Sequence, residues 1–205
     1  MLYSPLCQLE IDQEDPNCVD IKYPKAFDDT YIRPEVRLEI GPLASWQPSG
    51  EFTITPYAAE YFPKVFNKNE IHVRAIEGKR TFWEKATILH QEAHRPEGNL
   101  QPSRFSRHYY DLAMLAHSDI RMQALSDQGL LKDVVDFKMK FYPVGWAHYE
   151  TAVPGTLKLI PPERVRQSLI KDYRAMQEMI FGYRPSLSEI FEILTDLEEQ
   201  IHQIE

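Results

Sequence analysis

Residues 79–95 read KRTFWEKATILHQEAHR, and residues 104–115 read RFSRHYYDLAML. Both stretches place apolar residues at the three- and four-residue spacing of an amphipathic helix. The intervening HRPEGNLQPS contains proline and glycine, which break a helix, and Ser103 is the predicted N-cap of the second helix. The chain therefore places two consecutive helices side by side, both rich in basic, histidine and aromatic residues.

Strands are predicted before these helices, because short segments alternate apolar and polar residues between prolines, glycines and polar turn residues. The segments are CVDIKY (18–23), EVRLEIG (35–41), EFTIT (51–55) and EIHVRAI (70–76). We therefore expect a strand-rich region over residues 1–78.

Helices continue to the C-terminus. We expect one over residues 128–142, one that begins near Pro162 and runs to Gly182, and a last one opened by a capping box of Ser186 and Glu189. Strands followed by helices define an α+β fold with a helical C-terminal half, here residues 79–205.

Composition excludes several classes of protein. The 205 residues are 43% hydrophobic, which is typical of a packed globular chain. The net charge of −8 argues against nonspecific coating of a nucleic acid. No apolar run is long enough to span a membrane, the N-terminus does not resemble a signal peptide, and Cys7 and Cys18 lack metal-ligand spacing. We expect a cytoplasmic protein with reduced cysteines.

Charge is unevenly distributed along the chain. Residues 79–110 contain six Lys or Arg against three Glu, whereas residues 185–205 contain six acids and no Lys or Arg. An anionic ligand is therefore expected at the first segment.

Two patterns suggest a metal site, and both have a simpler interpretation. His90 and His94 share a helix face, but the metalloprotease pattern needs glutamate directly after the first histidine, where this chain has Gln91. Glu10 and Asp12 share a strand face, yet alternating acids on a strand are usually solvated. We predict no metal ligands at these positions.

Glu35, Arg37 and Glu39 alternate along one predicted strand and face the same way. They form either the solvent face of an edge strand or a carboxylate directed at a metal-bound phosphate, and the strand alone does not decide between the two.

The two helices carry the clearest chemical pattern. Arg107 and His108 lie four and three residues before Asp111, so all three project from one side. There are structural alternatives. Arg107 and Asp111 could form an ion pair within the helix, and Lys85 could be a partly buried side chain whose ammonium reaches water. Cations for phosphate together with a carboxylate are also what a phosphate-handling site requires.

The segments RTFWEKATILH and RFSRHYYDLAML, preceded by VRLEIG, resemble the AbiEii/AbiGii-type toxin family of nucleotidyltransferases, which acts in toxin–antitoxin and abortive-infection systems. Phe82, Glu84, Lys85 and Leu89 match its third motif. Arg107, His108, Asp111 and Leu112 match its fourth, with Arg107 in place of the common lysine and His108 in place of the common aspartate.

The resemblance implies a polymerase-β-type nucleotidyltransferase sheet followed by helices, and transfer of a nucleotide from an NTP, with Mg²⁺, to an RNA or protein acceptor. By resemblance, Lys85 contacts phosphate, Asp111 assists the acceptor or orients Lys85, and Glu39 is a carboxylate on the metal side. A cognate antitoxin is the implied genetic partner. The predicted substrate-binding residues are Arg80, Arg104, Arg107 and His108.

The family opens its catalytic core with a glycine turn followed by paired acids on a strand. Glu10 and Asp12 resemble the paired acids, but no glycine turn precedes them, because the first glycine is Gly41. We therefore expect a partial, truncated core that is inactive alone and that self-associates through its open sheet edge. The alternative is a non-catalytic module that uses the same helices to bind another protein.

Overall fold

A computed structural model of the chain describes residues 6–26, 28, 31–41 and 45–204. The chain forms two compact units. The first comprises residues 1–44 and 174–184, and the second comprises residues 45–173 and 185–205.

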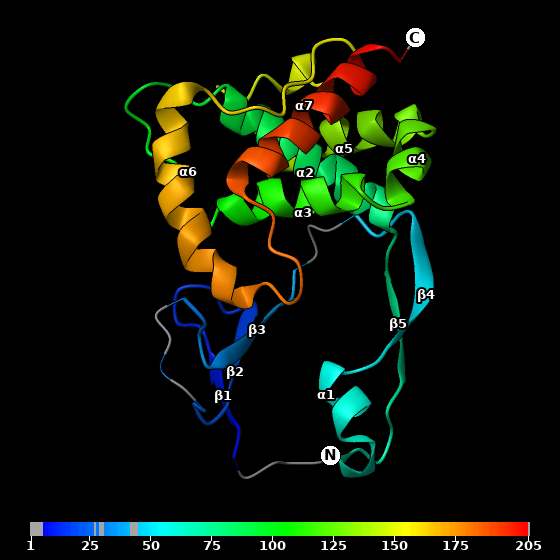
Figure 1. Ribbon diagram of the computed structural model, residues 1–205, viewed down its shortest axis with the longest axis vertical. Helices are drawn as coiled ribbons and strands as arrows, with labels where there is room; N and C mark the ends of the chain where they lie inside the picture. The colour runs from blue at the N-terminus through cyan, green and yellow to red at the C-terminus, as the bar shows by residue number, and fades with distance from the viewer. Residues whose placement is uncertain (1–5, 27, 29–30, 42–44, 205) are drawn as a thin grey trace. The chain divides into compact units, whose positions relative to one another are not determined.

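The first unit contains a three-stranded antiparallel sheet in the order β1-β2-β3 (Figure 1). Its strands are β1 (Gln8–Ile11), β2 (Cys18–Lys22) and β3 (Glu35–Glu39). In the register, Ile21 lies opposite Leu9 on one side and Val36 on the other, while Asp20 lies opposite Arg37. Apolar side chains therefore share one face of the sheet and charged side chains share the other.

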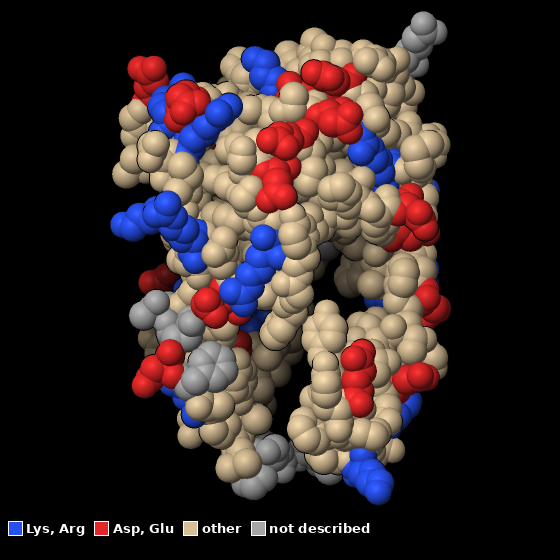
Figure 2. All heavy atoms as spheres, viewed as in Figure 1, with Lys and Arg blue, Asp and Glu red and all other residues tan. Residues whose placement is uncertain are grey.

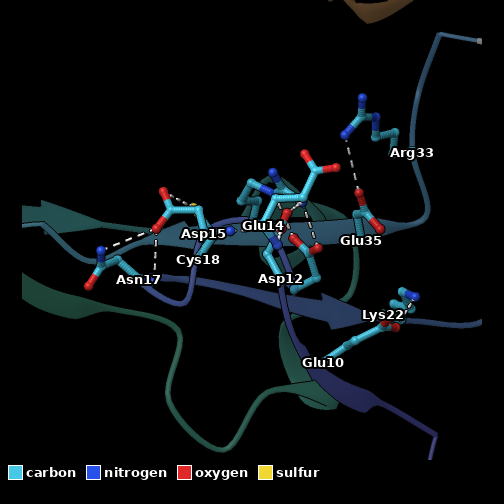
Figure 3. A network of polar contacts seen from close by, with 11 residues as sticks. Glu10, Asp12, Glu14, Asp15, Asn17, Cys18, Lys22, Arg33 and Glu35 are labelled. Atoms are coloured by element: carbon cyan, nitrogen blue, oxygen red, sulfur yellow. Dashed lines mark hydrogen bonds and ion pairs between the residues drawn. The ribbon is translucent and has the colours of Figure 1, made fainter.

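Ion pairs across the strands cover the charged face (Figure 3). Arg37 donates to Asp20 through Nε at 2.8 Å and to Asp12 through Nη2 at 2.7 Å. Lys22 pairs with Glu10. The hydrogen bonds from Arg37 are the main reason that the pKa of Asp20 is lowered. The alternating acids Glu10 and Asp12 thus each have a cationic partner within the sheet.

The apolar face of the same sheet is open to solvent. The exposed fractions are 62% for Leu9, 63% for Ile11, 51% for Val36 and 43% for Leu38. Large apolar side chains this exposed on one sheet face are typical of a surface that another chain or segment covers.

In the second unit, β4 (Ser49–Ile54) and β5 (Ile71–Ile76) form a two-stranded antiparallel ribbon. The connection between them contains α1 (Tyr57–Tyr61) and the 3₁₀ helix η1 (Pro63–Val65), as Figure 1 shows.

Helices follow from residue 78. They are α2 (Gly78–Ala93), α3 (Ser106–Ala116), α4 (Ile120–Leu125), α5 (Gln128–Phe141), η2 (Tyr149–Thr151), α6 (Glu163–Met176), η3 (Gln177–Met179) and α7 (Leu187–His202). Helix α2 packs against α3, α4 and α5, and α3 also packs against α7. Phe82, Trp83 and Leu89 of α2 have no exposed surface and form the centre of this helical core. Acidic side chains gather over α7 (Figure 2).

The α+β fold with a helical C-terminal half is confirmed, and the ends of β2, β3, β4 and β5 lie within two residues of their predicted positions. The capping box at Ser186 and Glu189 is also confirmed, since each residue bonds the backbone of the other. The predicted division after residue 78 stays a prediction.

Two helix boundaries were predicted wrongly. Helix α3 begins at Ser106, and Ser103 does not cap it. Helix α6 ends at Met176, because the chain tightens into η3 and then becomes extended at Ile180, whose side chain is buried. Gly182, the predicted end, lies beyond this turn with φ 81°. The short helices α1 and α4 were not predicted.

Candidate phosphate-binding site on helices α2 and α3

Helix α2 is buried on most of its circumference, because α3, α4 and α5 all pack on it. Trp83 is fully buried and its indole N–H donates to the carbonyl of Ala124 at 3.2 Å. Thr87 is also fully buried and donates to the carbonyl of Trp83 one turn earlier. Glu84 and Lys85 lie on the part of α2 that solvent still reaches, where their side chains are 35% and 20% exposed.

Helix α3 is positioned by a carboxylate from α6. Asp172 accepts hydrogen bonds from the backbone N–H of Arg104 at 2.6 Å and of Ser106 at 2.9 Å, and from the Ser106 hydroxyl at 2.7 Å. Arg104 has φ 68°, a left-handed conformation that is unusual outside glycine. The backbone N–H groups at the start of α3 thus find their acceptor in a residue distant in sequence. The negative charge of that residue also interacts favourably with the positive end of the helix dipole.

Lys85, His108 and Asp111 meet between α2 and α3. Lys85 Nζ donates to Asp111 Oδ2 at 2.7 Å and lies 3.1 Å from His108 Nδ1. Lys85 and Asp111 thus lie together as expected, whereas the expected convergence of Arg107 and Glu39 with them stays a prediction. An ammonium carries three N–H groups, so one N–H of Lys85 has no acceptor among the described residues.

His108 is held in its neutral form at this site. Its pKa is lowered to about 3, mainly by burial and in smaller part by the charges of Lys85, Arg107 and Lys138. A neutral ring can accept the Lys85 N–H through Nδ1, which leaves the proton on Nε2. The site therefore presents a charged lysine beside a neutral imidazole.

The other predicted site residues lie in different surroundings. Arg107 is exposed, and Asp111 bonds Lys85 rather than forming the alternative intrahelical pair with Arg107. Arg80 is only 2% exposed and donates to Glu84 at 2.9 Å and to the carbonyl of Gln47 at 2.7 Å.

Arg104 is half-buried and precedes α3. Glu39 is exposed at the end of β3 and belongs to the first unit. The substrate-binding roles of the arginines and the catalytic roles of Lys85, Asp111 and Glu39 stay predictions.

The histidine pair of α2 is part of the packed interior. His90 is fully buried, accepts the backbone N–H of Lys158 on Nδ1 at 3.0 Å and lies 3.0 Å from the carbonyl of His148 on Nε2. His94 Nδ1 lies 2.8 Å from the carbonyl of His90. Within the described ranges no group of three or more His, Cys, Asp or Glu is placed to hold a metal ion.

Sequence reasoning missed two residues that shape the site, Asp172 and Lys138. Asp172 gives no local signal, because its partners lie 66 and 68 residues away. Lys138 does give a local signal. It lies seven residues after Leu131 and four after Val134, which are both buried, and so it occupies the apolar stripe of α5. A lysine on such a stripe indicates either a long stem that reaches water or a functional cation.

A lysine held by an aspartate on the next helix, in a chain whose strands precede its helices, agrees with the nucleotidyltransferase toxins. The chain matches the family model described as Nucleotidyl transferase AbiEii toxin, Type IV TA system, over residues 6–198, and it belongs to that family. No curated protein and no solved structure matched it.

A type IV toxin–antitoxin family implies an antitoxin as partner. Among the helices of the described chain, none has the length and apolar character needed to cross a membrane.

Proposed function

We propose that the α2–α3 site binds the phosphate chain of an NTP for a nucleotidyltransferase-type toxin. The observation that carries this proposal is the contact of Lys85 with both Asp111 and His108, which leaves one ammonium N–H directed at no protein acceptor among the described residues. Membership of the AbiEii family supports the same reaction class.

In this proposal Lys85 contacts a phosphate oxygen, and its positive charge stabilises the charge that develops during phosphoryl transfer. Asp111 orients Lys85, since the 2.7 Å hydrogen bond restrains the ammonium on a long flexible side chain. Arg107 is exposed on the same helix and adds a further cation for substrate. The acceptor is an RNA or a protein hydroxyl, and a cognate antitoxin is the genetic partner.

The family also implies a divalent metal, which when bound would neutralise charge that develops during nucleotidyl transfer. The described residues do not fit it, because they contain no suitable carboxylate cluster and because Glu10 and Asp12 pair with Lys22 and Arg37. We derive no step through a metal. For the same reason we expect this chain to bind NTP and to transfer little or none of it unaided.

Two assays on the same preparation test the proposal. Calorimetry with each NTP measures binding, and labelling of total RNA and protein from α-³²P-NTP with Mg²⁺ measures transfer. We expect binding that Lys85→Met weakens, with little transfer. Robust transfer that Asp111→Ala abolishes would contradict the expected inactivity. The absence of NTP binding would instead favour a non-catalytic module in which these helices bind another protein.

A further inference from the structure

Lys138 on α5 has no part in the proposed function, and it is a cation that pairs with no carboxylate among the described residues. Its Nζ donates to the backbone carbonyl of Glu84 at 3.2 Å and lies 5.7 Å from the ring centroid of Tyr149. No carboxylate lies within ion-pair distance of it in the described chain. The Glu84 carboxylate is engaged by Arg80 at 2.9 Å.

The position of Lys138 links it to the proposed phosphate site. Glu84, whose carbonyl it bonds, directly precedes Lys85 on α2. Its charge acts on His108, and the charge of Lys85 acts on Lys138. Asp111 from α3 bonds Lys85 itself, and Lys138 from α5 bonds the carbonyl of the residue before it, so two helices that pack on α2 bring charged groups to this turn.

The electrostatic state of Lys138 is unfavourable without an anion. Its pKa is lowered to about 8, mainly by burial, while the Glu84 carboxylate acts in the opposite direction and the charge of Lys85 in the same direction as burial. The side chain remains partly open to solvent, so a ligand can reach it. A polyphosphate placed between the two ammonium groups would relieve their repulsion and replace the water that Lys138 has lost.

We infer that Lys138 and Lys85 together form a two-lysine subsite for the phosphate chain of a nucleoside triphosphate. This inference rests on the proposed function and extends it to a third helix, with Lys138 as a second phosphate contact. RNA also carries phosphate oxygens, but the two ammonium groups lie around one short segment of α2, which suits adjacent phosphates on one small ligand.

The probe is inorganic tripolyphosphate. Binding of an RNA oligonucleotide without terminal phosphates is measured in parallel for comparison. We expect Lys138→Met to weaken tripolyphosphate binding at least about tenfold, the loss that one charge-assisted phosphate contact implies. Lys140→Met is the matched control, because Lys140 is exposed on the same helix two residues later, and it should change the affinity less than about twofold.

The pH dependence separates a phosphate contact from a packing role. Lys138 loses its proton as pH rises through about 8, so the affinity ratio of wild type to Lys138→Met should fall between about pH 7 and about pH 9.5. The charged or titratable groups around it are Glu84, Lys85, His108 and Tyr149, and all of them are retained in the variant. A ratio that does not change with pH would overturn the inference.

A measurement on the wild-type chain covers the case in which Lys138→Met does not fold. After reductive ¹³C-methylation, the Lys138 resonance should titrate near pH 8 and shift to higher pH when tripolyphosphate is added. A titration midpoint that stays the same when tripolyphosphate is added would overturn the inference. It would also be overturned if Lys138→Met weakened the binding of RNA but not that of tripolyphosphate. If Lys85→Met weakens tripolyphosphate binding and Lys138→Met does not, the inference fails while the proposed function stands.

Discussion

Asp172 of α6 accepts hydrogen bonds from both the backbone N–H and the hydroxyl of Ser106, at 2.9 and 2.7 Å. Ser106 is the first residue of α3 and is fully buried. One carboxylate therefore fixes the start of the helix that carries His108 and Asp111, and the site depends on a contact far from it in sequence.

Replacement of Asp172 by alanine should therefore affect both stability and binding. Loss of its three hydrogen bonds to part-buried donors at the start of α3 should lower the free energy of unfolding by about 2–3 kcal/mol. NTP affinity should fall as well, because α3 is no longer held at its first turn. Urea denaturation and calorimetry measure the two effects. Lys171→Gln, at the exposed neighbouring residue, should change neither.

The Glu92–Arg95 ion pair should contribute to stability alone. Glu92 is completely buried and receives both Arg95 Nε and Nη2 at 2.7 Å. Glu92→Gln leaves the guanidinium without its charge partner, and we expect a loss of about 3–5 kcal/mol in the free energy of unfolding. The exposed Glu97 is the control, and Glu97→Gln should cost less than about 0.5 kcal/mol by urea denaturation. Equal effects would contradict the role of the buried pair.

The contact between Lys85 and Asp111 should matter little for folding. Their side chains are 20% and 39% exposed, and partly solvated ion pairs contribute about 1 kcal/mol or less. A double-mutant cycle with Lys85→Met and Asp111→Asn should give a coupling energy of that size in urea denaturation. A coupling of about 3 kcal/mol would instead mark the pair as part of the structural core.

His90 should make the chain less stable in mild acid. Burial lowers its folded pKa to about 4, below the usual value of 6.5, so the unfolded chain binds the proton first as pH falls. The contribution is complete above about pH 6.5 and is lost progressively between there and about pH 4. His90→Gln should flatten this dependence in urea denaturation, whereas substitution of the exposed His117 should leave it unchanged.

The open face of the β1–β3 sheet should make the chain self-associate. Leu9, Ile11, Val36 and Leu38 are all more than two fifths exposed on that face. Sedimentation at micromolar concentration should show a dimer or larger species, and Leu38→Lys should shift it towards monomer. A strictly monomeric wild-type chain whose β3 amides are well protected from hydrogen exchange would contradict the expected self-association.

Local patterns in the sequence predicted much of the fold. Strands β2 and β3 could be predicted because apolar and polar residues alternate along each of these short segments. The capping box could be predicted because Ser186 and Glu189 lie only three residues apart. The proximity of Lys85 and Asp111 followed from two consecutive helices and from the family resemblance.

Contacts distant in sequence were not predictable. Ser103 looked like an N-cap, but the acceptor for the start of α3 is Asp172 on another helix. Arg107 and Asp111 had the spacing of an intrahelical pair, yet the tertiary contact with Lys85 takes the carboxylate. Lys138 could be identified only as an unusual residue on an apolar stripe, and its neighbours came from the packing of α5 on α2.

The dependence of nucleotide affinity on the number of phosphates tests the central claim most directly. Calorimetry with an NTP, its diphosphate and its monophosphate should show that wild-type affinity rises with each phosphate. We expect Lys85→Met to lose most of this gradient, with NTP binding weakened about tenfold or more. A gradient equally steep in Lys85→Met and in wild type would contradict the assignment of Lys85 as the phosphate-binding residue.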